Sequence, residues 1–163
     1  MTISIVRAEL QHLSILAPLF DAYRVFYQQA SNLRLAEHFL RERIEAKQSV
    51  IFLALDPTQG SEGGREAGLG FVQLYPSFSS VSAQRLWILN DLFVDAKARR
   101  RGVAQALMNA ARDFAAQDGA KGLFLETAHD NHGAQALYKS LGYLRNTEYY
   151  YFLPSTAAKH ESP

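Results

Sequence analysis

The segment RRRGVA, residues 99–104, combines residue types that suit the binding of a phosphate. It lies between the apolar run 89–94 and a stretch from residue 103 in which apolar side chains recur every three or four positions, as on one face of a helix. A helix begins with unpaired N–H groups and the positive end of its dipole, Gly102 permits close backbone approach, and the arginines add bidentate donors. The segment therefore predicts a pyrophosphate site. The alternative is a solvated turn in which Gly102 only eases the bend from strand to helix.

Other chemistries find little support in the sequence. The chain has no cysteine, which excludes disulfides, thiolate metal sites and a cysteine nucleophile. His129 and His132 lie close together but form no HExxH motif, so solvated or capping histidines are favoured and we expect no metal. No GxxxxGK[ST] motif occurs, and the glycines of GLGFV, residues 68–72, fall within a predicted strand rather than before a helix.

Length, charge and the amino-terminal residues limit the class of protein. The 163 residues suffice for a hydrophobic core without staples, and 48% of them are hydrophobic. A net charge of +1 argues against a dedicated nucleic-acid-binding protein. The start MTISIVRAEL lacks a signal-peptide pattern, and no apolar run is long enough to span a membrane. We expect a cytoplasmic protein with neither a nucleic-acid nor a membrane partner, with one domain over residues 1–154 and a disordered tail over 155–163.

Hydrophobic periodicity predicts the elements that position the turn. The predicted strands cover residues 2–7, 50–55, 69–75, 85–94, 122–127 and 147–153. The predicted helices cover residues 13–27, 33–46, 103 to the stop at Gly119, and 133–141. Pro18 is expected to kink or divide the first helix, the second should bury Leu33, Phe39 or Leu40, and Ile44, and residues 56–68 read as a surface loop. The order predicts an α/β (α+β) fold, a mixed sheet with helices on its faces.

Two motifs in this order resemble those of the GNAT N-acetyltransferase superfamily. Residues 89–111, LNDLFVDAKARRRGVAQALMNAA, are similar to its acetyl-coenzyme-A motif, whose turn [Q/R]xxGx[G/A] is matched at Arg99, Gly102 and Ala104. Residues 131–143, NHGAQALYKSLGY, resemble its later NxxAxxLYxxxGF pattern. The resemblance extends over the strand order from Ile3 to Leu153 and includes bacterial diamine and histone-type acetyltransferases.

The resemblance implies a fold, a co-substrate and a set of binding residues. The acyl-CoA N-acyltransferase fold has a mixed, mostly antiparallel sheet with helices on both faces and a splayed parallel strand pair, here Leu89–Val94 and Leu123–Thr127. The implied co-substrate is acetyl-CoA, without a metal. The residues implied to bind it are Leu92, Phe93, Val94, Arg99, Arg100, Arg101, Gly102, Val103, Ala104, Asn131, Ala134 and Tyr138.

The implied reaction is direct attack of an amine on the acetyl thioester. Presenting a primary alkylamine as its neutral form at pH 7 costs on the order of 4.6 kcal/mol, so a base is needed. The resemblance favours Asp91, although the acidic residue of diamine-type relatives tends to fall at the position of Asn90; Glu126 and a water chain stay open. A bulge would be needed to bring Asp91 to the face where Asn90 would otherwise point.

The other implied roles also have structural alternatives. Spacing alone makes Tyr138 a core aromatic, whereas the resemblance makes it the general acid for the departing thiolate. A backbone N–H near Phe93 or Val94 would stabilise the oxyanion. Asn131 would contact the pantetheine arm, cap the later helix, or both.

The acceptor site is the least defined part of the sequence. Substrate contacts are expected from Tyr23, Tyr27, Tyr75, Asn90 and Glu126, with Phe78 and Trp87 as further candidates. Core packing is the alternative for each aromatic. We expect a small amine or polyamine as the acceptor, the alternatives being a protein lysine or a silent acyl-CoA-binding module. The aromatic segment 147–153 allows a homodimer.

Overall fold

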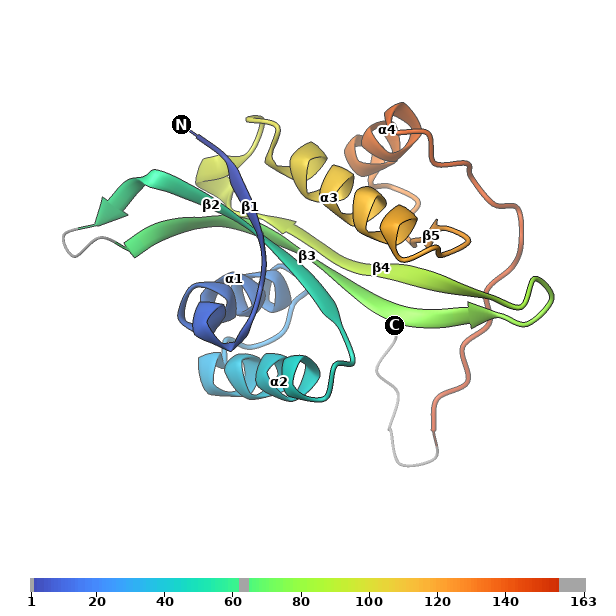
Figure 1. Cartoon of the computed structure of the whole chain (residues 1–163), viewed down its shortest axis with the longest axis horizontal. Helices are drawn as coiled ribbons and strands as arrows, with labels where there is room; N and C mark the ends of the chain where they lie inside the picture. The colour runs from blue at the N-terminus through green and yellow to red at the C-terminus, as the bar shows by residue number, and fades with distance from the viewer. Residues whose placement is uncertain (1, 62–64, 156–163) are drawn as a thin grey trace. The chain divides into compact units, whose positions relative to one another are not determined.

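The computed structural model describes residues 2–61 and 65–155, and the chain divides into two compact units, Met1–Glu126 and Thr127–Pro163. The first unit contains a five-stranded sheet in the order β1-β2-β3-β4-β5, the sequence order of its strands (Figure 1). The strands are β1 (Ser4–Arg7), β2 (Val50–Ser61), β3 (Arg65–Ser79), β4 (Gln84–Val94) and β5 (Leu123–Phe124). Strands β1 to β4 pair antiparallel and β5 runs parallel to β4, so the predicted mixed sheet is confirmed.

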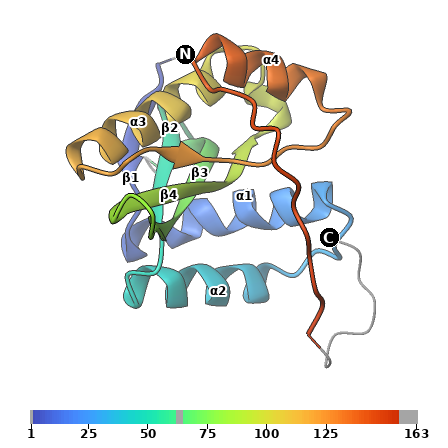
Figure 2. The same ribbon diagram turned by 90° about the vertical axis from the view of Figure 1, so that its right-hand side faces the viewer.

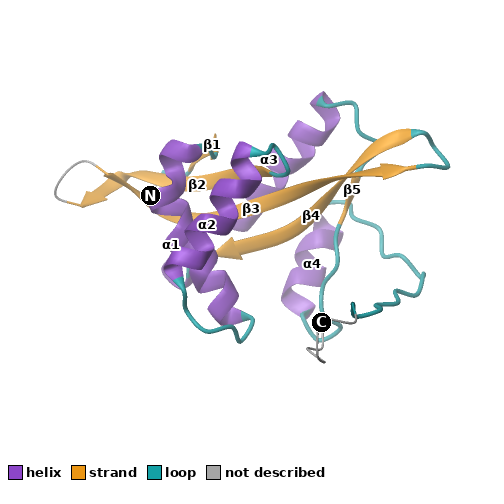
Figure 3. Ribbon diagram, turned by 90° about the horizontal axis from the view of Figure 1, so that it is seen from below, coloured by secondary structure: helices purple, strands orange, loops and turns teal. Residues whose placement is uncertain are grey.

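Helices cover both faces of this sheet. Helices α1 (Leu13–Phe26) and α2 (Leu33–Glu45) lie on one face and α3 (Val103–Gln117) on the other (Figure 2). The core under α1 and α2 is made of fully buried side chains such as Leu16, Leu40 and Leu53. Figure 3 shows the long strands β2, β3 and β4 running side by side beneath these helices. The sheet therefore separates two packed layers, and a side chain on any strand faces one or the other.

Two details of the helices differ from the sequence prediction. Helix α1 runs unbroken through Pro18, because the burial of flanking residues such as Ala17 and Leu19 outweighs the lost hydrogen bond. Helix α2 buries Ala36 and Leu40, whereas Leu33 in its first turn is exposed. The apolar stripe that meets the sheet thus begins one turn later than predicted.

The connection between β2 and β3 is not the loop predicted over residues 56–68. Strand β2 continues to Ser61 and β3 begins at Arg65, with shifts of register between Ala54 and Leu55 and between Asp56 and Ser61. Pairing of the two backbones extends the ladder through residues whose side chains alone would favour a loop.

The second unit contains α4 (His132–Ser140), which Asn131 caps by accepting a hydrogen bond from the Ala134 N–H at 3.2 Å. The strand predicted over residues 147–153 is wrong for the structure, since residues 143–155 form neither helix nor strand. A strand requires a paired neighbour, and the described sheet ends at β5. The predicted tail over 155–163 lies almost wholly outside the described residues. Among the described helices, none combines the length and hydropathy that crossing a membrane requires.

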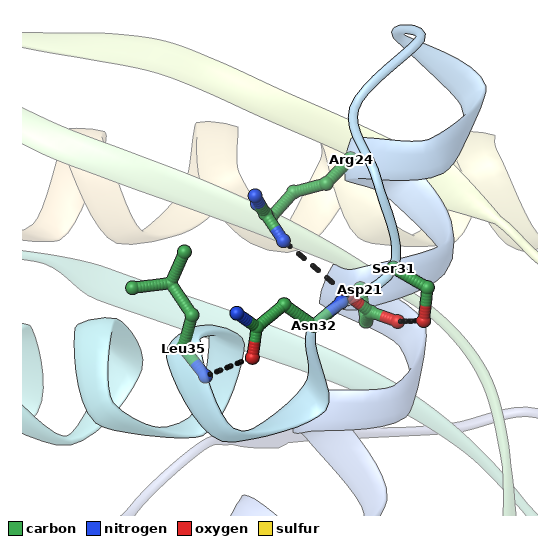
Figure 4. A network of polar contacts seen from close by, with 5 residues as sticks. All are labelled: Asp21, Arg24, Ser31, Asn32 and Leu35. Atoms are coloured by element: carbon green, nitrogen blue, oxygen red, sulfur yellow. Dashed lines mark hydrogen bonds and ion pairs between the residues drawn. The ribbon is translucent and has the colours of Figure 1, made fainter.

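A buried carboxylate fixes the connection between α1 and α2. Asp21 is 8% exposed and accepts hydrogen bonds from the Ser31 hydroxyl at 2.6 Å and the Asn32 N–H at 2.8 Å (Figure 4). The Arg24 guanidinium lies 3.3 Å from the same carboxylate. Asn32 in turn caps α2 by accepting from the Leu35 N–H. The Ser31 hydrogen bond, followed by that of Asn32, lowers the pKa of Asp21 below its ordinary value of 3.8, against the opposing effect of burial.

We predict that Asp21→Asn lowers the free energy of unfolding at pH 7 by about 1–3 kcal/mol, the usual range for hydrogen bonds to a charged group. Because the folded pKa is lowered, this contribution is fully present above pH 3.8 and is lost as the pH falls through the folded pKa. Urea denaturation between pH 7 and pH 3 measures it. The exposed Asp113→Asn is the control, and a difference that stays constant down to pH 3 would contradict a role of the charge.

Candidate active site

Strand β4 has one extra residue at one point of its pairing with β3. Gln73 pairs with Asp91 and the next residue of β3, Leu74, pairs with Leu89, so Asn90 has no partner on β3. This is the geometry of a β-bulge. The bulge that the sequence required for Asp91 to face the predicted site is therefore present.

The bulge decides which face of the sheet Asp91 occupies. Gln73 and Leu74 are neighbours on β3, so their side chains point to opposite faces of the sheet. Each partner on β4 faces the same side as the β3 residue with which it pairs. Asp91 therefore faces the layer of α1 and α2, where the Tyr23 and Phe93 rings lie 6.3 Å apart between centroids. Leu89 faces the layer of α3. A regular strand would have placed both side chains on one face.

Asp91 is buried and held by hydrogen bonds. Its side chain is 4% exposed, and it accepts from the Gln73 amide at 2.5 Å and from the Asn90 amide at 3.0 Å. Burial, followed by the charge of Asp91 and a hydrogen bond to it, raises the pKa of Tyr23 far above its ordinary value of 10.0. Neutral donors thus surround one carboxylate and replace the water that burial removes.

Tyr75 belongs to the same cluster. Burial, followed by the charge of Asp91, raises the pKa of Tyr75 to about 12, while the positive charge of Arg43 opposes the shift. Tyr23 and Tyr75 therefore stay neutral phenols at physiological pH. The cluster of Asp91, Gln73, Tyr23 and Tyr75 therefore contains one carboxylate and several hydrogen-bond donors that do not lose a proton at this pH.

Gln73 is the residue of this cluster that the sequence analysis missed. Its side chain is fully buried, with 0% exposed, and its Oε1 atom has no hydrogen-bond partner. An unsatisfied buried acceptor costs about 1–3 kcal/mol. The signal in the sequence was a polar residue inside the apolar strand LGFVQLY, a place where polar side chains are rare.

The RRRGVA turn has the backbone of an anion site. Arg100 has a φ of 59° and Gly102 a φ of 79°, and Gly102 is the N-cap of α3, which no side chain caps. Left-handed residues in a turn direct successive N–H groups to one side, and the start of α3 adds its dipole. Nothing lies within 4 Å of the position that a Cβ on Gly102 would occupy. The Arg99 Nε donates to the Val94 carbonyl at 3.2 Å, which ties the turn to the end of β4.

The parallel pair ends where the bulge begins. Trp87 pairs with Leu123 and Ile88 with Phe124, and no later residue of β4 pairs with β5 in the described part of the chain. Among the strands that the structure describes, the segment Leu89–Val94 therefore pairs with β3 alone. The predicted parallel pairing is confirmed, although β5 is much shorter than the strand predicted over residues 122–127.

The profile of the Acetyltransferase (GNAT) family matches residues 16–143. The chain belongs to this family. It is 45% identical over 156 residues to an uncharacterized N-acetyltransferase, YhfO, of Bacillus subtilis (strain 168), which covers 96% of this chain and 99% of that protein. It is 38% identical over 108 residues to a probable acetyltransferase of Haemophilus influenzae (strain ATCC 51907 / DSM 11121 / KW20 / Rd), which covers 66% of this chain and 69% of that one.

Solved structures agree with this assignment. The crystal structure of a probable acetyltransferase is 44% identical, with a TM-score of 0.83 over 94% of this chain and 98% of that chain. The aminoglycoside N-acetyltransferase AAC(6')-Iy in complex with CoA shares the fold, with a TM-score of 0.75 over 95% of each chain at 20% identity. The GNAT family consists of acetyl-CoA-dependent acyltransferases, and this GNAT protein is an N-acetyltransferase.

The predicted acceptor residues do not all meet in this GNAT protein. Tyr23 and Tyr75 lie in the Asp91 cluster, and Asn90 contacts Asp91 from the bulge. Tyr27 is 57% exposed at the end of α1, with its ring edge-to-face on Tyr23. Glu126 was predicted on a strand, but β5 ends at Phe124 and Glu126 is exposed beyond it. Of the two predicted acids, Asp91 is therefore the buried one that is held by hydrogen bonds, whereas Glu126 is exposed.

Two further aromatic candidates have other roles in the structure. Trp87 packs against Phe114 of α3 and donates to Asp118 at 2.8 Å, so it belongs to the opposite layer from Asp91. Phe78 is exposed, and the Arg85 guanidinium lies over its ring. Both residues lie toward the turn of the long β3–β4 hairpin, away from Asp91, and therefore do not contribute to its cluster.

The remaining predicted residues divide between the two units. Leu92 and Val94 are half-buried on β4, and Val103 and Ala104 begin α3. Asn131, Ala134 and Tyr138 lie in the second unit, where the Tyr138 and Tyr143 rings are 6.0 Å apart between centroids. In the described residues, no group of His, Cys, Asp and Glu could hold a metal ion.

We predict that Gly70→Ala lowers the free energy of unfolding by about 2–3 kcal/mol, within the range for overpacking. A Cβ on Gly70 would meet the Phe93 carbonyl oxygen and would lie 3.1 Å from the Val94 Cα, so the backbone of β4 itself would have to move. Urea denaturation measures the loss.

Gly68→Ala is the matched control on the same strand. Its Cβ would meet side-chain atoms only, the Ile15 Cγ2 at 2.7 Å and the Leu19 Cδ1 at 2.9 Å, whereas at Gly70 it meets backbone. We expect it to cost less than Gly70→Ala, because side chains yield more readily than a paired strand. Equal losses for the two variants would contradict a close backbone approach at Gly70.

Proposed function

We propose that this chain transfers the acetyl group of acetyl-CoA to the primary amine of a small amine or polyamine, by direct attack in a ternary complex. The observation that supports this most strongly is the buried Asp91, which the bulge turns toward the cluster of Tyr23, Gln73 and Tyr75. Such a carboxylate can both attract an ammonium group and take its proton.

The RRRGVA turn would hold the phosphates of the co-substrate. Its left-handed residues, the uncapped start of α3 and the three arginines together supply backbone N–H groups and positive charge. The unpaired edge of Leu89–Val94 would receive the pantetheine arm, with Leu92, Phe93 and Val94 in contact with it. An N–H of Phe93 or Val94 would stabilise negative charge on the thioester carbonyl oxygen.

Asp91 would act as the general base, directly or through one water. Deprotonation of an alkylammonium at pH 7 requires on the order of 4.6 kcal/mol, and a positioned base takes this proton before the nitrogen can attack. After passing that proton to solvent, the same base takes the proton that the neutral amine loses as the C–N bond forms. Burial restricts competing access of solvent. Glu126, exposed beyond β5, lacks comparable hydrogen-bond partners in the described residues and is the weaker candidate.

Tyr138 would protonate the departing thiolate, as the resemblance implies, and Asn131 and Ala134 would contact the pantetheine arm. Proton transfer from a phenol to a thiolate is uphill by about 2 kcal/mol for ordinary pKa values. A hydrogen bond to the sulfur would already lower the barrier to cleavage of the C–S bond.

The charge and the aromatic rings of the cluster favour a cationic acceptor. A carboxylate beside several aromatic rings attracts an ammonium group through its charge and through ring faces. A structural neighbour, an aminoglycoside acetyltransferase from an uncultured soil metagenomic sample, was solved with sisomicin, and its fold is shared at 20% identity. We therefore favour amines and polyamines over a protein lysine. A cytoplasmic location and a homodimer stay predictions from the sequence.

We predict thiol release from acetyl-CoA that depends on an added amine, within a panel of short diamines, spermidine, amino acids and a lysine peptide. Asp91→Asn should lower kcat/KM by about 100-fold or more and Tyr138→Phe by about 10-fold or more, the range for general acid–base groups. A chromogenic disulfide measures the thiol without background, because the chain has no cysteine.

The controls separate catalysis from folding. Asp113→Asn, on the exposed face of α3, should keep the wild-type rate. Unfolding curves of both site variants establish that they fold. Binding of CoA without turnover on the whole panel would favour the silent binding module, and a rate confined to the lysine peptide would favour a protein acceptor.

We predict that Gly102→Ala weakens the affinity for CoA by about ten-fold, because an alanine at positive φ costs roughly 1–2 kcal/mol and moves the N–H groups of the turn. Gly119→Ala is the matched control, since Gly119 has a φ of 69° at the other end of α3 and nothing within 4 Å of its Cβ position. Titration calorimetry measures both. Equal affinities for the two variants would contradict the phosphate site at this turn.

A further inference from the structure

The Oε1 atom of Gln73 is a buried acceptor without a partner, next to the carboxylate that we propose as the base. Gln73 lies on β3 opposite Asp91, and its Nε2 donates to Asp91 Oδ2 at 2.5 Å. This hydrogen bond fixes the orientation of the amide, because the reverse orientation would place Oε1 against the negative oxygen of Asp91. An orphan of this kind in a native structure requires an explanation.

We propose that Gln73 Oε1 accepts the N–H that the acceptor amine keeps, and that Gln73 thereby selects primary over secondary amines. This inference rests on the proposed function and names a specificity-determining residue for it. Gln73 contacts the substrate in this proposal and takes no part in the proton transfer.

The reaction itself creates the need for such an acceptor. A neutral primary amine has one lone pair and two N–H bonds. The lone pair forms the bond to the acetyl carbon, the C–S electron pair leaves on the thiolate, and one N–H proton passes to Asp91 and from there to solvent. The second N–H stays on the nitrogen of the amide product. It requires its own acceptor within the buried cluster.

The neighbours of Asp91 cannot provide this acceptor as well as Gln73 does. The hydroxyl of Tyr23 is engaged with Asp91, and the amide of Asn90 also donates to it. Gln73 is hydrogen-bonded to Asp91, and the two side chains are 0% and 4% exposed, so in this proposal the amine enters the cluster far enough to meet both. The two acceptor atoms therefore match the two N–H bonds of a primary amine, whereas an N-methyl amine has only one.

The test compares each primary amine that the wild-type enzyme accepts with its N-methyl counterpart. The wild type should prefer the primary amine by about ten-fold or more in kcat/KM, the effect of one buried hydrogen bond. Gln73→Met, which keeps the size of the side chain without an acceptor oxygen, should reduce this preference to about two-fold or less by slowing the primary amine. Gln73→Glu, protonated because it shares a proton with Asp91, keeps both a donor to Asp91 and an acceptor oxygen, and it should retain the preference at a lower rate.

The preference ratio separates a specificity role from a merely structural one. If Gln73 only oriented Asp91, Gln73→Met would slow both amines by the same factor and leave the ratio unchanged, which would overturn the proposal. The exposed Gln117→Met on α3 is the control for the substitution itself. A wild type that acetylates amines without preferring primary ones overturns this inference alone, whereas a wild type that acetylates no amine overturns the proposed function.

Discussion

The extra residue in β4 is the constraint on which the proposed chemistry depends. Asn90 has no partner on β3, and this single insertion turns every later side chain of β4 to the opposite face. Asp91 consequently faces α1, while Trp87 and Leu89 before it face α3. The parallel pairing with β5 ends at Ile88, two residues before the insertion. The bulge thus coincides with the place where, among the described strands, β4 keeps only its pairing with β3.

The carboxylate that the bulge buries is stabilised by the same elements that form the hydrophobic core. Tyr23 comes from α1, whose residues Leu16 and Phe20 belong to the core, and its ring lies 5.9 Å from that of Phe71 on β3. A buried charge is tolerated only when donors replace water, and here packing holds those donors in place. Asp21 fixes the following connection to α2. The acceptor side of the proposed site is therefore as rigid as the core beneath it.

Much of this arrangement could be predicted from the sequence, and the errors in assigning strands share one physical cause. The start of α3 at Val103 follows from local periodicity and the mostly antiparallel sheet from the family resemblance, and both were predicted correctly. The bulge could be stated from the sequence only as a requirement for Asp91 to face the site. Trp87, Leu89 and Asp91 alternate regularly in burial, and only the pairing with β3 reveals the extra residue. Residues 56–61 and 147–153 were misassigned for the same reason: whether a segment becomes a strand depends on a partner distant in the sequence.

In the first unit, strand β4 also sets the distance between the proposed base, Asp91, and the proposed phosphate-binding turn. Asp91 and the end of the strand at Val94 are three residues apart, about 10 Å of extended backbone, and the Arg99 guanidinium attaches the turn to Val94. Neither end can shift without breaking the ladder with β3, where Gly70 allows the Phe93 carbonyl to approach closely. A substrate that binds its phosphates at the turn must therefore carry its reactive group at a fixed distance from Asp91. This fixed spacing favours one long, extended carrier molecule over small acyl donors that lack the phosphates.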